Sequence, residues 1–174
     1  MSTHSSHLGR LIVISTAVLS AFALAITTAT PATASNADTV AVSEEEAISL
    51  LQEALKDHGY QGDLSEDALR AEYERSSDQI SPMAANGCST PKVAKKLTKK
   101  WDRIFKPACD RHDRCYSPGS KTARKTCDIR FRNAMLKICA PRQDRKSCNS
   151  AAHIYYYSVR AFGKSHYKGK GDPS

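Results

Sequence analysis

The sequence predicts a small all-α domain, linked by disulfides and built on two antiparallel helices that carry a histidine and an aspartate. Three observations favour this fold class. All six cysteines fall between Cys88 and Cys148, two stretches within this region show helical spacing, and no convincing strand pair can be recognised. The length of 174 residues suits one such domain together with segments that are removed during processing.

Residues 1–34 are expected to form a secretory signal peptide. Arg10 supplies a positive charge, residues 11–26 are almost wholly apolar, and Ala32-Thr33-Ala34 matches the small-residue cleavage pattern. A membrane anchor is the alternative, but this apolar stretch is short and rich in Ala and Thr. We therefore expect a secreted, extracellular protein.

Charge divides the remaining chain. Residues 35–86 contain 12 acidic and 3 basic residues, a net charge of −9, whereas residues 87–174 contain 6 acidic and 22 basic residues, a net charge of +16. A basic exported domain favours an anionic partner such as a membrane surface, a cell wall polymer or nucleic acid, although the charge can also serve solubility alone. Nucleic acid is not expected, because no recognition motif accompanies the charge.

The acidic segment, residues 35–85, predicts a helical hairpin. Ser43 and Glu46 form a capping box for a helix that ends near His58, and a second helix runs from Ser65 to about Arg75. This hairpin is either a propeptide or the N-terminal layer of the mature protein.

The first of the two central helices is predicted to begin near Pro107, a residue that suits a first helical turn. Cys109, His112 and Cys115 then lie three residues apart, near one face of the helix. Asp113 points about 100° further round the helix.

The second central helix is predicted over residues 122–138. Asp128 begins an apolar stripe on this helix, and burying a lone charge is expensive, so Asp128 needs a partner. His112 is the obvious candidate, and an arginine is the alternative. The stripe continues through Phe131, Met135 and Cys139.

The chain is predicted to end with a helix and a tail. The helix spans residues 149–162, and Gly163 stops it. Residues 164–174 are rich in Gly and Lys and are predicted to be a basic disordered tail.

The cysteines of an exported chain predict disulfides, and six of them allow 15 pairings, among which spacing alone does not choose. Zinc is the alternative. Its best ligand set would be Cys109, His112, Cys115 and Cys127, and the secretory context argues against it.

The central residues suit the hydrolysis of an ester. Histidine can serve as the base for an attacking water, and a carboxylate can hold its other ring nitrogen. Negative charge that develops on the carbonyl oxygen needs an electrophile such as Ca²⁺, which binds carboxylate and backbone oxygens. His112, Asp128, Asp113 and the loop 86–89 can provide these groups.

The pattern Cys109-x-x-His112-Asp113-x-Cys115-Tyr116 resembles the histidine–aspartate helix of secreted phospholipases A2, and most of all their small bacterial and fungal branch. The similarity includes the stripe that begins at Asp128 and covers residues 86–163. Further matching stretches are Phe105-Lys106-Pro107-Ala108-Cys109, Cys148-Asn149-Ser150-Ala151 and Phe162-Gly163.

The resemblance implies a phospholipase A2-like catalytic domain over residues 86–163. His112 would be the general base and Asp128 its orienting carboxylate. Asp113, Asn86 and Gly87 would bind Ca²⁺, although the family usually has an aspartate where this chain has Asn86. The resemblance also implies disulfides 88–109 and 139–148, which would leave Cys115 and Cys127 as a third pair.

The implied activity is calcium-dependent hydrolysis of the sn-2 ester of glycerophospholipids, which releases a fatty acid and a lysophospholipid. The partner would be an anionic phospholipid membrane or micelle surface, and we expect a monomer. The alternative is a non-catalytic module of the same fold that binds membranes or acts as a toxin.

Overall fold

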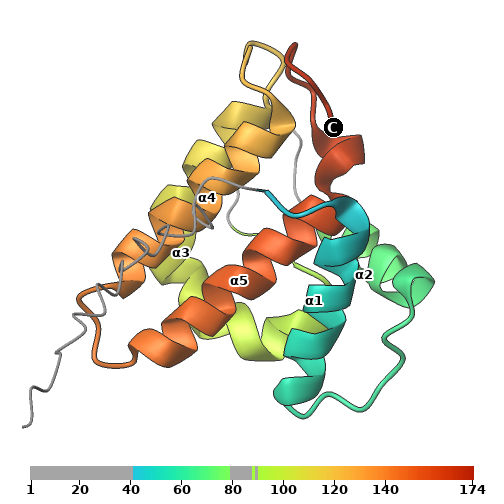
Figure 1. Ribbon diagram of the computed structural model, residues 1–174, viewed down its shortest axis with the longest axis vertical. Coiled ribbons are helices and arrows are strands. Elements are labelled where there is room, and N and C mark those ends of the chain that lie inside the picture. The colour runs from blue at the N-terminus through green and yellow to red at the C-terminus, as the bar shows by residue number, and fades with distance from the viewer. Residues whose placement is uncertain (1–40, 79–87, 89) are drawn as a thin grey trace, which may run out of the picture. The chain divides into compact units, whose positions relative to one another are not determined.

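The computed structural model describes residues 41–78, 88 and 90–174, and these residues form helices and no strand (Figure 1). The predicted fold class, a small disulfide-linked all-α domain, is confirmed. The α-helices are α1 (Glu44–Asp57), α2 (Glu66–Asp78), α3 (Lys95–Tyr116), α4 (Arg124–Cys139) and α5 (Arg145–Phe162), and two short 3-10 helices are η1 (Lys92–Ala94) and η2 (Gly163–His166). The predicted signal peptide and residues 86 and 87 lie outside the described residues. In the described part of the chain, no helix is long and apolar enough to cross a membrane.

The helix α3 begins twelve residues before Pro107, so the predicted start of this helix was wrong. Pro107 lies inside the helix and is exposed, as is Arg103 one turn earlier. Proline cannot donate to the carbonyl four residues before it, but on this side of the helix water can solvate that carbonyl. The opposite side carries Trp101, Phe105 and the other buried residues, which keep the helix on the core.

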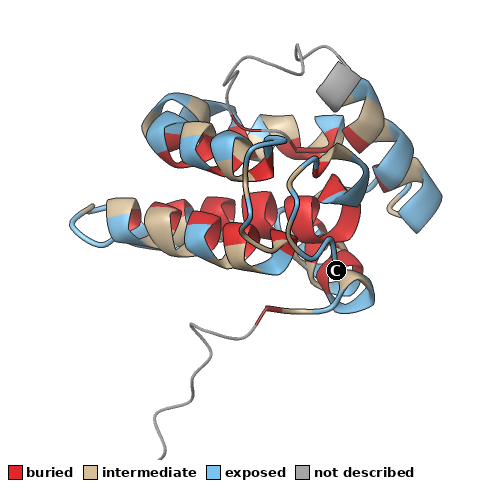
Figure 2. Ribbon diagram, turned by 90° about the horizontal axis from the view of Figure 1, so that it is seen from above, coloured by how far each residue is buried: buried red, intermediate tan, exposed pale blue. Residues whose placement is uncertain are grey.

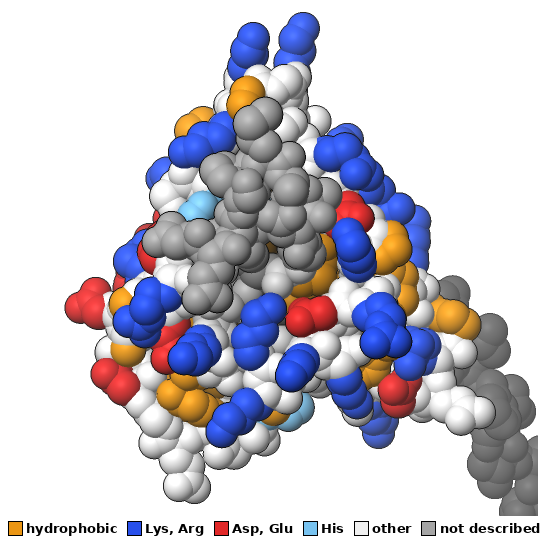
Figure 3. Space-filling view, turned by 180° about the vertical axis from the view of Figure 1, so that it is seen from behind, with side chains coloured by type: hydrophobic (Ala, Val, Ile, Leu, Met, Phe, Trp, Pro, Cys, Tyr) orange, Lys and Arg blue, Asp and Glu red, His pale blue; other side chains and the backbone are white. Residues whose placement is uncertain are grey.

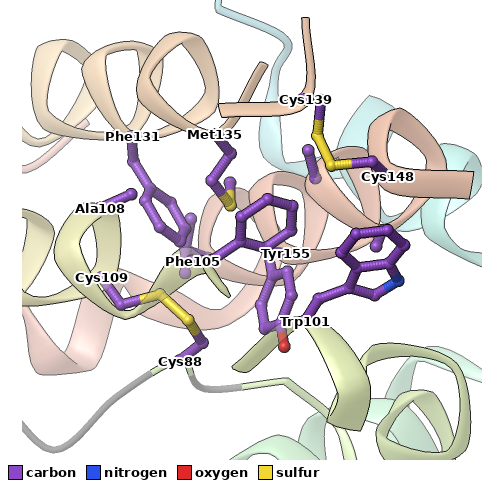
Figure 4. Packing of buried hydrophobic residues seen from close by; sticks show 13 residues of the cluster. Cys88, Trp101, Phe105, Ala108, Cys109, Phe131, Met135, Cys139, Cys148 and Tyr155 are labelled. Carbon is purple, nitrogen blue, oxygen red and sulfur yellow. A yellow bond between two sulfur atoms is a disulfide. The ribbon is translucent and has the colours of Figure 1, made fainter. Parts of the chain in front are cut away.

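The central core lies between α3, α4 and α5 (Figure 4). Phe105 stacks on Trp101 with ring centroids 5.8 Å apart and meets Tyr155 of α5 edge to face at 5.6 Å. Such aromatic pairs add directional contacts to the burial of apolar surface. Figure 1 shows α3 and α4 side by side and antiparallel, as predicted, which brings their facing side chains together.

The two helices of the acidic hairpin pack on the same domain. Leu51 and Leu55 of α1 and Leu69 of α2 are fully buried, in one apolar cluster with Phe162 of α5. The capping box is confirmed in part, because the Ser43 hydroxyl accepts a hydrogen bond of 3.1 Å from the Glu46 amide. In Figure 2 the buried residues of the helices face one another, which is the pattern of a shared core.

The C-terminal tail is ordered, in contrast to the disorder predicted for residues 164–174. The amides of Lys168 and Lys170 donate to the carbonyls of Tyr116 and Ser120 at 2.8 and 2.7 Å. The side chain of Tyr167 is buried, and its hydroxyl donates to the Thr122 carbonyl at 2.7 Å. This aromatic anchor and the backbone bonds fix a segment whose Gly and Lys content is typical of disorder.

Candidate active site

His112 and Asp128 meet across the facing sides of α3 and α4. The Nε2 atom of His112 lies 2.7 Å from Oδ1 of Asp128. A carboxylate oxygen accepts hydrogen bonds, so Nε2 carries the ring proton and donates it. In the neutral ring, Nδ1 then holds the lone pair and is the atom that can accept a proton.

The imidazole of His112 is held between two aromatic rings. Phe131 of α4 stacks on it with ring centroids 4.6 Å apart, and Tyr116, one turn further along α3, lies at 4.2 Å. The side chain of His112 is 6% exposed. Packing on both sides restricts the rotation of the ring.

Asp128 is fully buried and surrounded by donors. Its Oδ1 atom also accepts a bond of 2.7 Å from the Tyr116 hydroxyl, and its Oδ2 atom accepts a bond of 3.0 Å from Nη1 of Arg160. Nη1 of Arg124 lies 3.9 Å from Oδ2. Two guanidinium groups therefore compensate a negative charge that would be costly to bury alone.

The Tyr116 hydroxyl stays protonated. Burial raises the pKa of Tyr116 well above its ordinary value, and the negative charge of Asp128 raises it further. Burial raises the pKa of Tyr73 in the same way, with a smaller contribution from Asp128. A phenol that keeps its proton remains a donor to the carboxylate.

The sequence indicated that His112 and Asp128 would meet, but it did not reveal the two arginines that contact Asp128. Both partners considered for Asp128, a histidine and an arginine, contact it, because Oδ1 accepts from His112 and Oδ2 accepts from Arg160. Arg124 could have been found, because it precedes Asp128 by one helical turn. Arg160 had no local signal, because it reaches Asp128 from α5, 32 positions away.

The described cysteines form three disulfides: Cys88–Cys109, Cys115–Cys127 and Cys139–Cys148. Two of them are the pairs that the resemblance implied, and Cys115–Cys127 is the pair that it left over. Cys115–Cys127 links the end of α3 to the start of α4, close to both members of the His112–Asp128 pair. No described cysteine is free, so none can serve zinc as a thiolate.

A family model described as prokaryotic phospholipase A2 matches residues 60–163. The chain belongs to this family. The match begins in front of α2, so the family's pattern includes a helix that our boundary at residue 86 leaves out.

Curated proteins of similar sequence match a shorter region of the chain. Conodipine-P2 of Conus purpurascens is 42% identical over 57 residues, which cover 32% of this chain and 29% of the relative. The secretory phospholipase A2 of Beauveria bassiana (strain ARSEF 2860) is 37% identical over 65 residues, which cover 34% of each chain. The chain thus spans about a third of the length of these relatives. No solved structure matches the chain.

Phospholipases A2 generally use Ca²⁺, and the predicted ligands are only partly described here. Asp113 is half-buried on α3, while Asn86 and Gly87 lie outside the described residues. The disulfide joins Cys88, the next residue after Gly87, to Cys109, and Cys109 and Asp113 share one side of α3 at i and i+4. A carboxylate, an amide oxygen and a backbone carbonyl are donors that suit Ca²⁺. Among the described residues alone, no group of three or more His, Cys, Asp or Glu could hold a metal ion.

Proposed function

We propose that this protein is a secreted phospholipase A2 that hydrolyses the sn-2 ester of glycerophospholipids with the help of Ca²⁺. The observation that carries the proposal is the 2.7 Å contact between His112 Nε2 and Asp128, which directs Nδ1 to serve as the base. The products would be a free fatty acid and a lysophospholipid.

In this mechanism, His112 Nδ1 takes a proton from the water that attacks the ester carbonyl. Asp128 holds the ring in the required tautomer and stabilises the imidazolium that forms. The leaving alkoxide then receives the proton from His112. Phe131 and Tyr116 keep the ring from rotating while the proton moves.

Calcium, when bound by Asp113, Asn86 and Gly87, would supply positive charge next to the carbonyl oxygen of the ester. Asn86 contributes an amide in place of a carboxylate, and calcium affinity follows the charge of the ligands. We therefore expect weak binding, with a dissociation constant of roughly 10⁻⁴–10⁻³ M, which suits an extracellular protein.

The partner we propose is an anionic phospholipid surface. Exposed basic side chains follow one another along α3 at helical spacing, as Lys96, Lys99, Lys100, Arg103, Lys106, Arg111 and Arg114. Figure 3, a view from behind, displays more Lys and Arg than Asp and Glu side chains on the face that it shows. Such a field attracts an anionic surface and weakens with salt.

The test uses the full chain, produced by secretion so that its disulfides form, and anionic vesicles whose two acyl positions carry different labels. We expect calcium-dependent release of the sn-2 fatty acid, which chelation stops. His112→Ala should remove nearly all release, and Asp128→Asn should cost less, because a misoriented histidine keeps some basicity. Vesicle binding without any release would instead identify a non-catalytic membrane-binding module. A folded His112→Ala variant with unchanged turnover would contradict the assigned base.

A further inference from the structure

Arg160 joins the buried carboxylate of the active site to a segment 118 positions earlier in the chain. Its Nη1 atom donates to Asp128 Oδ2 at 3.0 Å. Its Nε and Nη2 atoms donate to the Val42 carbonyl at 3.2 and 3.1 Å. The residue is 3% exposed, so these bonds form out of contact with bulk water. The planar guanidinium fork is thus fixed at both of its ends.

The segment that holds Arg160 is itself well anchored. The Val42 amide donates to the hydroxyl of Tyr156 on α5 at 3.3 Å. Two positions later, the Glu44 carboxylate pairs with Nη2 of Arg124, the second arginine beside Asp128. Residues 42–44, which we call the N-terminal clamp, therefore contact both guanidinium groups that compensate Asp128.

We propose that Arg160 is a positioning residue for the His112–Asp128 pair and that the N-terminal clamp keeps Arg160 in place. This inference rests on the proposed esterase function. Arg160 does not touch substrate. It fixes the rotation of the Asp128 carboxylate, and Asp128 in turn orients the imidazole through Oδ1.

Without the clamp, the guanidinium of Arg160 loses two of its three bonds and can turn away from Asp128. The carboxylate would then rotate toward Arg124, and Oδ1 would no longer lie in line with His112 Nε2. A misdirected imidazole lowers the rate of proton transfer, while substrate binding is little affected. The clamp therefore belongs to the mature enzyme, and processing that removes residue 42 would reduce its activity.

The experiment uses the full chain with single substitutions. Arg160→Met removes the positioning bonds, and Arg160→Lys keeps the charge and one contact. Arg142→Met is the control, since Arg142 also packs over an aromatic ring, that of Trp101, and its pairing with Asp144 lies outside the clamp. Glu44→Gln weakens the clamp, and Glu45→Gln makes the same change of charge at the next, exposed position.

For Arg160→Met we expect kcat to fall by about 10- to 100-fold, as for other residues that orient a catalytic ligand, with KM changed by less than about twofold. Arg160→Lys should recover most of this loss, and Glu44→Gln should lower kcat severalfold. Arg142→Met and Glu45→Gln should leave kcat unchanged. In nitrogen-labelled protein, the His112 Nε2 proton should give a protected NMR signal that Arg160→Met abolishes and Arg142→Met preserves.

The inference is overturned if Arg160→Met or Glu44→Gln, folded by their melting curves, keeps wild-type kcat while the NMR signal also persists. Glu44→Gln carries the test even if Arg160→Met does not fold. A wild-type protein with a protected His112 signal and no ester hydrolysis would overturn the proposed function, yet the NMR comparison would still decide the positioning role.

Discussion

The hydroxyl of Tyr116 donates to Oδ1 of Asp128 at 2.7 Å, the same oxygen and the same distance at which the imidazole of His112 is held. One carboxylate oxygen thus receives two donors from consecutive turns of α3. The shared acceptor links the position of the phenol to the orientation of the imidazole.

Tyr116→Phe removes one of these donors and keeps the ring that packs on His112. We expect kcat to fall by about tenfold or less, because Arg160 and His112 still hold the carboxylate, and unfolding to become easier by about 1 kcal/mol. Tyr167→Phe is the control, since the Tyr167 hydroxyl donates to the Thr122 carbonyl and not to Asp128. Equal losses of kcat in the two variants would contradict a role for the Tyr116 hydroxyl in catalysis.

Gly163 provides space for Tyr116. A Cβ atom at Gly163 would lie 3.1 Å from the Tyr116 hydroxyl, which must then shift by a few tenths of an ångström. Gly163→Ala should therefore lower kcat severalfold, even though its φ of −76° suits alanine. Gly119→Ala, where a Cβ meets nothing within 4 Å, should not affect kcat. Steady-state kinetics of both variants, with melting curves, make the comparison.

Removal of Cys115–Cys127 or of Cys139–Cys148 should lower stability by similar amounts, but the two removals should differ in their effect on activity. Cys115–Cys127 and Cys139–Cys148 close short loops with sequence separations of 12 and 9. Replacing either pair by alanines should cost about 3 kcal/mol by the loop-entropy estimate. Of these two losses, only that of Cys115–Cys127 should also lower kcat in the folded protein, because this bond joins α3 to α4 beside His112 and Asp128. Denaturant titration and kinetics below the unfolding midpoint measure the two effects separately.

Asn86→Asp should tighten calcium binding, since it adds one negative charge to the proposed ligand set. The calcium concentration for half-maximal activity should fall, and turnover at saturating calcium should change little. Asn149→Asp makes the same change of charge near the start of α5 and outside the proposed ligand set. It should leave the calcium affinity unchanged. Calorimetric titration of the three proteins is the measurement, and unchanged affinity in Asn86→Asp would exclude residue 86 as a ligand.

The contact between His112 and Asp128 could be predicted, because the sequence shows on which face of its helix each residue lies. Helical spacing fixes that Cys109, His112 and Cys115 share a face, and a lone Asp128 on an apolar stripe requires a partner. The same reasoning could not reach Arg160, since its contact with Asp128 depends on how α5 packs across α4. A basic residue at the C-terminal end of a helix is also typical of a solvent-exposed position.

The two errors of secondary structure have the same origin. Proline is a common first residue of a helix. In the middle of α3, Pro107 is tolerated because Arg103, whose carbonyl loses its donor, is exposed to water. The composition of residues 164–174 is typical of a disordered chain, and the buried side chain of Tyr167 orders it together with backbone hydrogen bonds from Lys168 and Lys170. In both cases tertiary packing overrides a local preference.

Arg124 brings the two ends of the described chain to one place: its Nη2 atom pairs with Glu44, and its Nε atom donates to the Pro173 carbonyl at 2.8 Å. Ends that meet in this way allow circular permutation. A short flexible linker could join Ser174 to Ala41, and new ends could be opened between Gln61 and Gly62, in the exposed turn between α1 and α2. Such a rearranged chain would keep every described helix intact. Its new termini could be used for immobilisation or fusion without disturbing Arg124 and the tail.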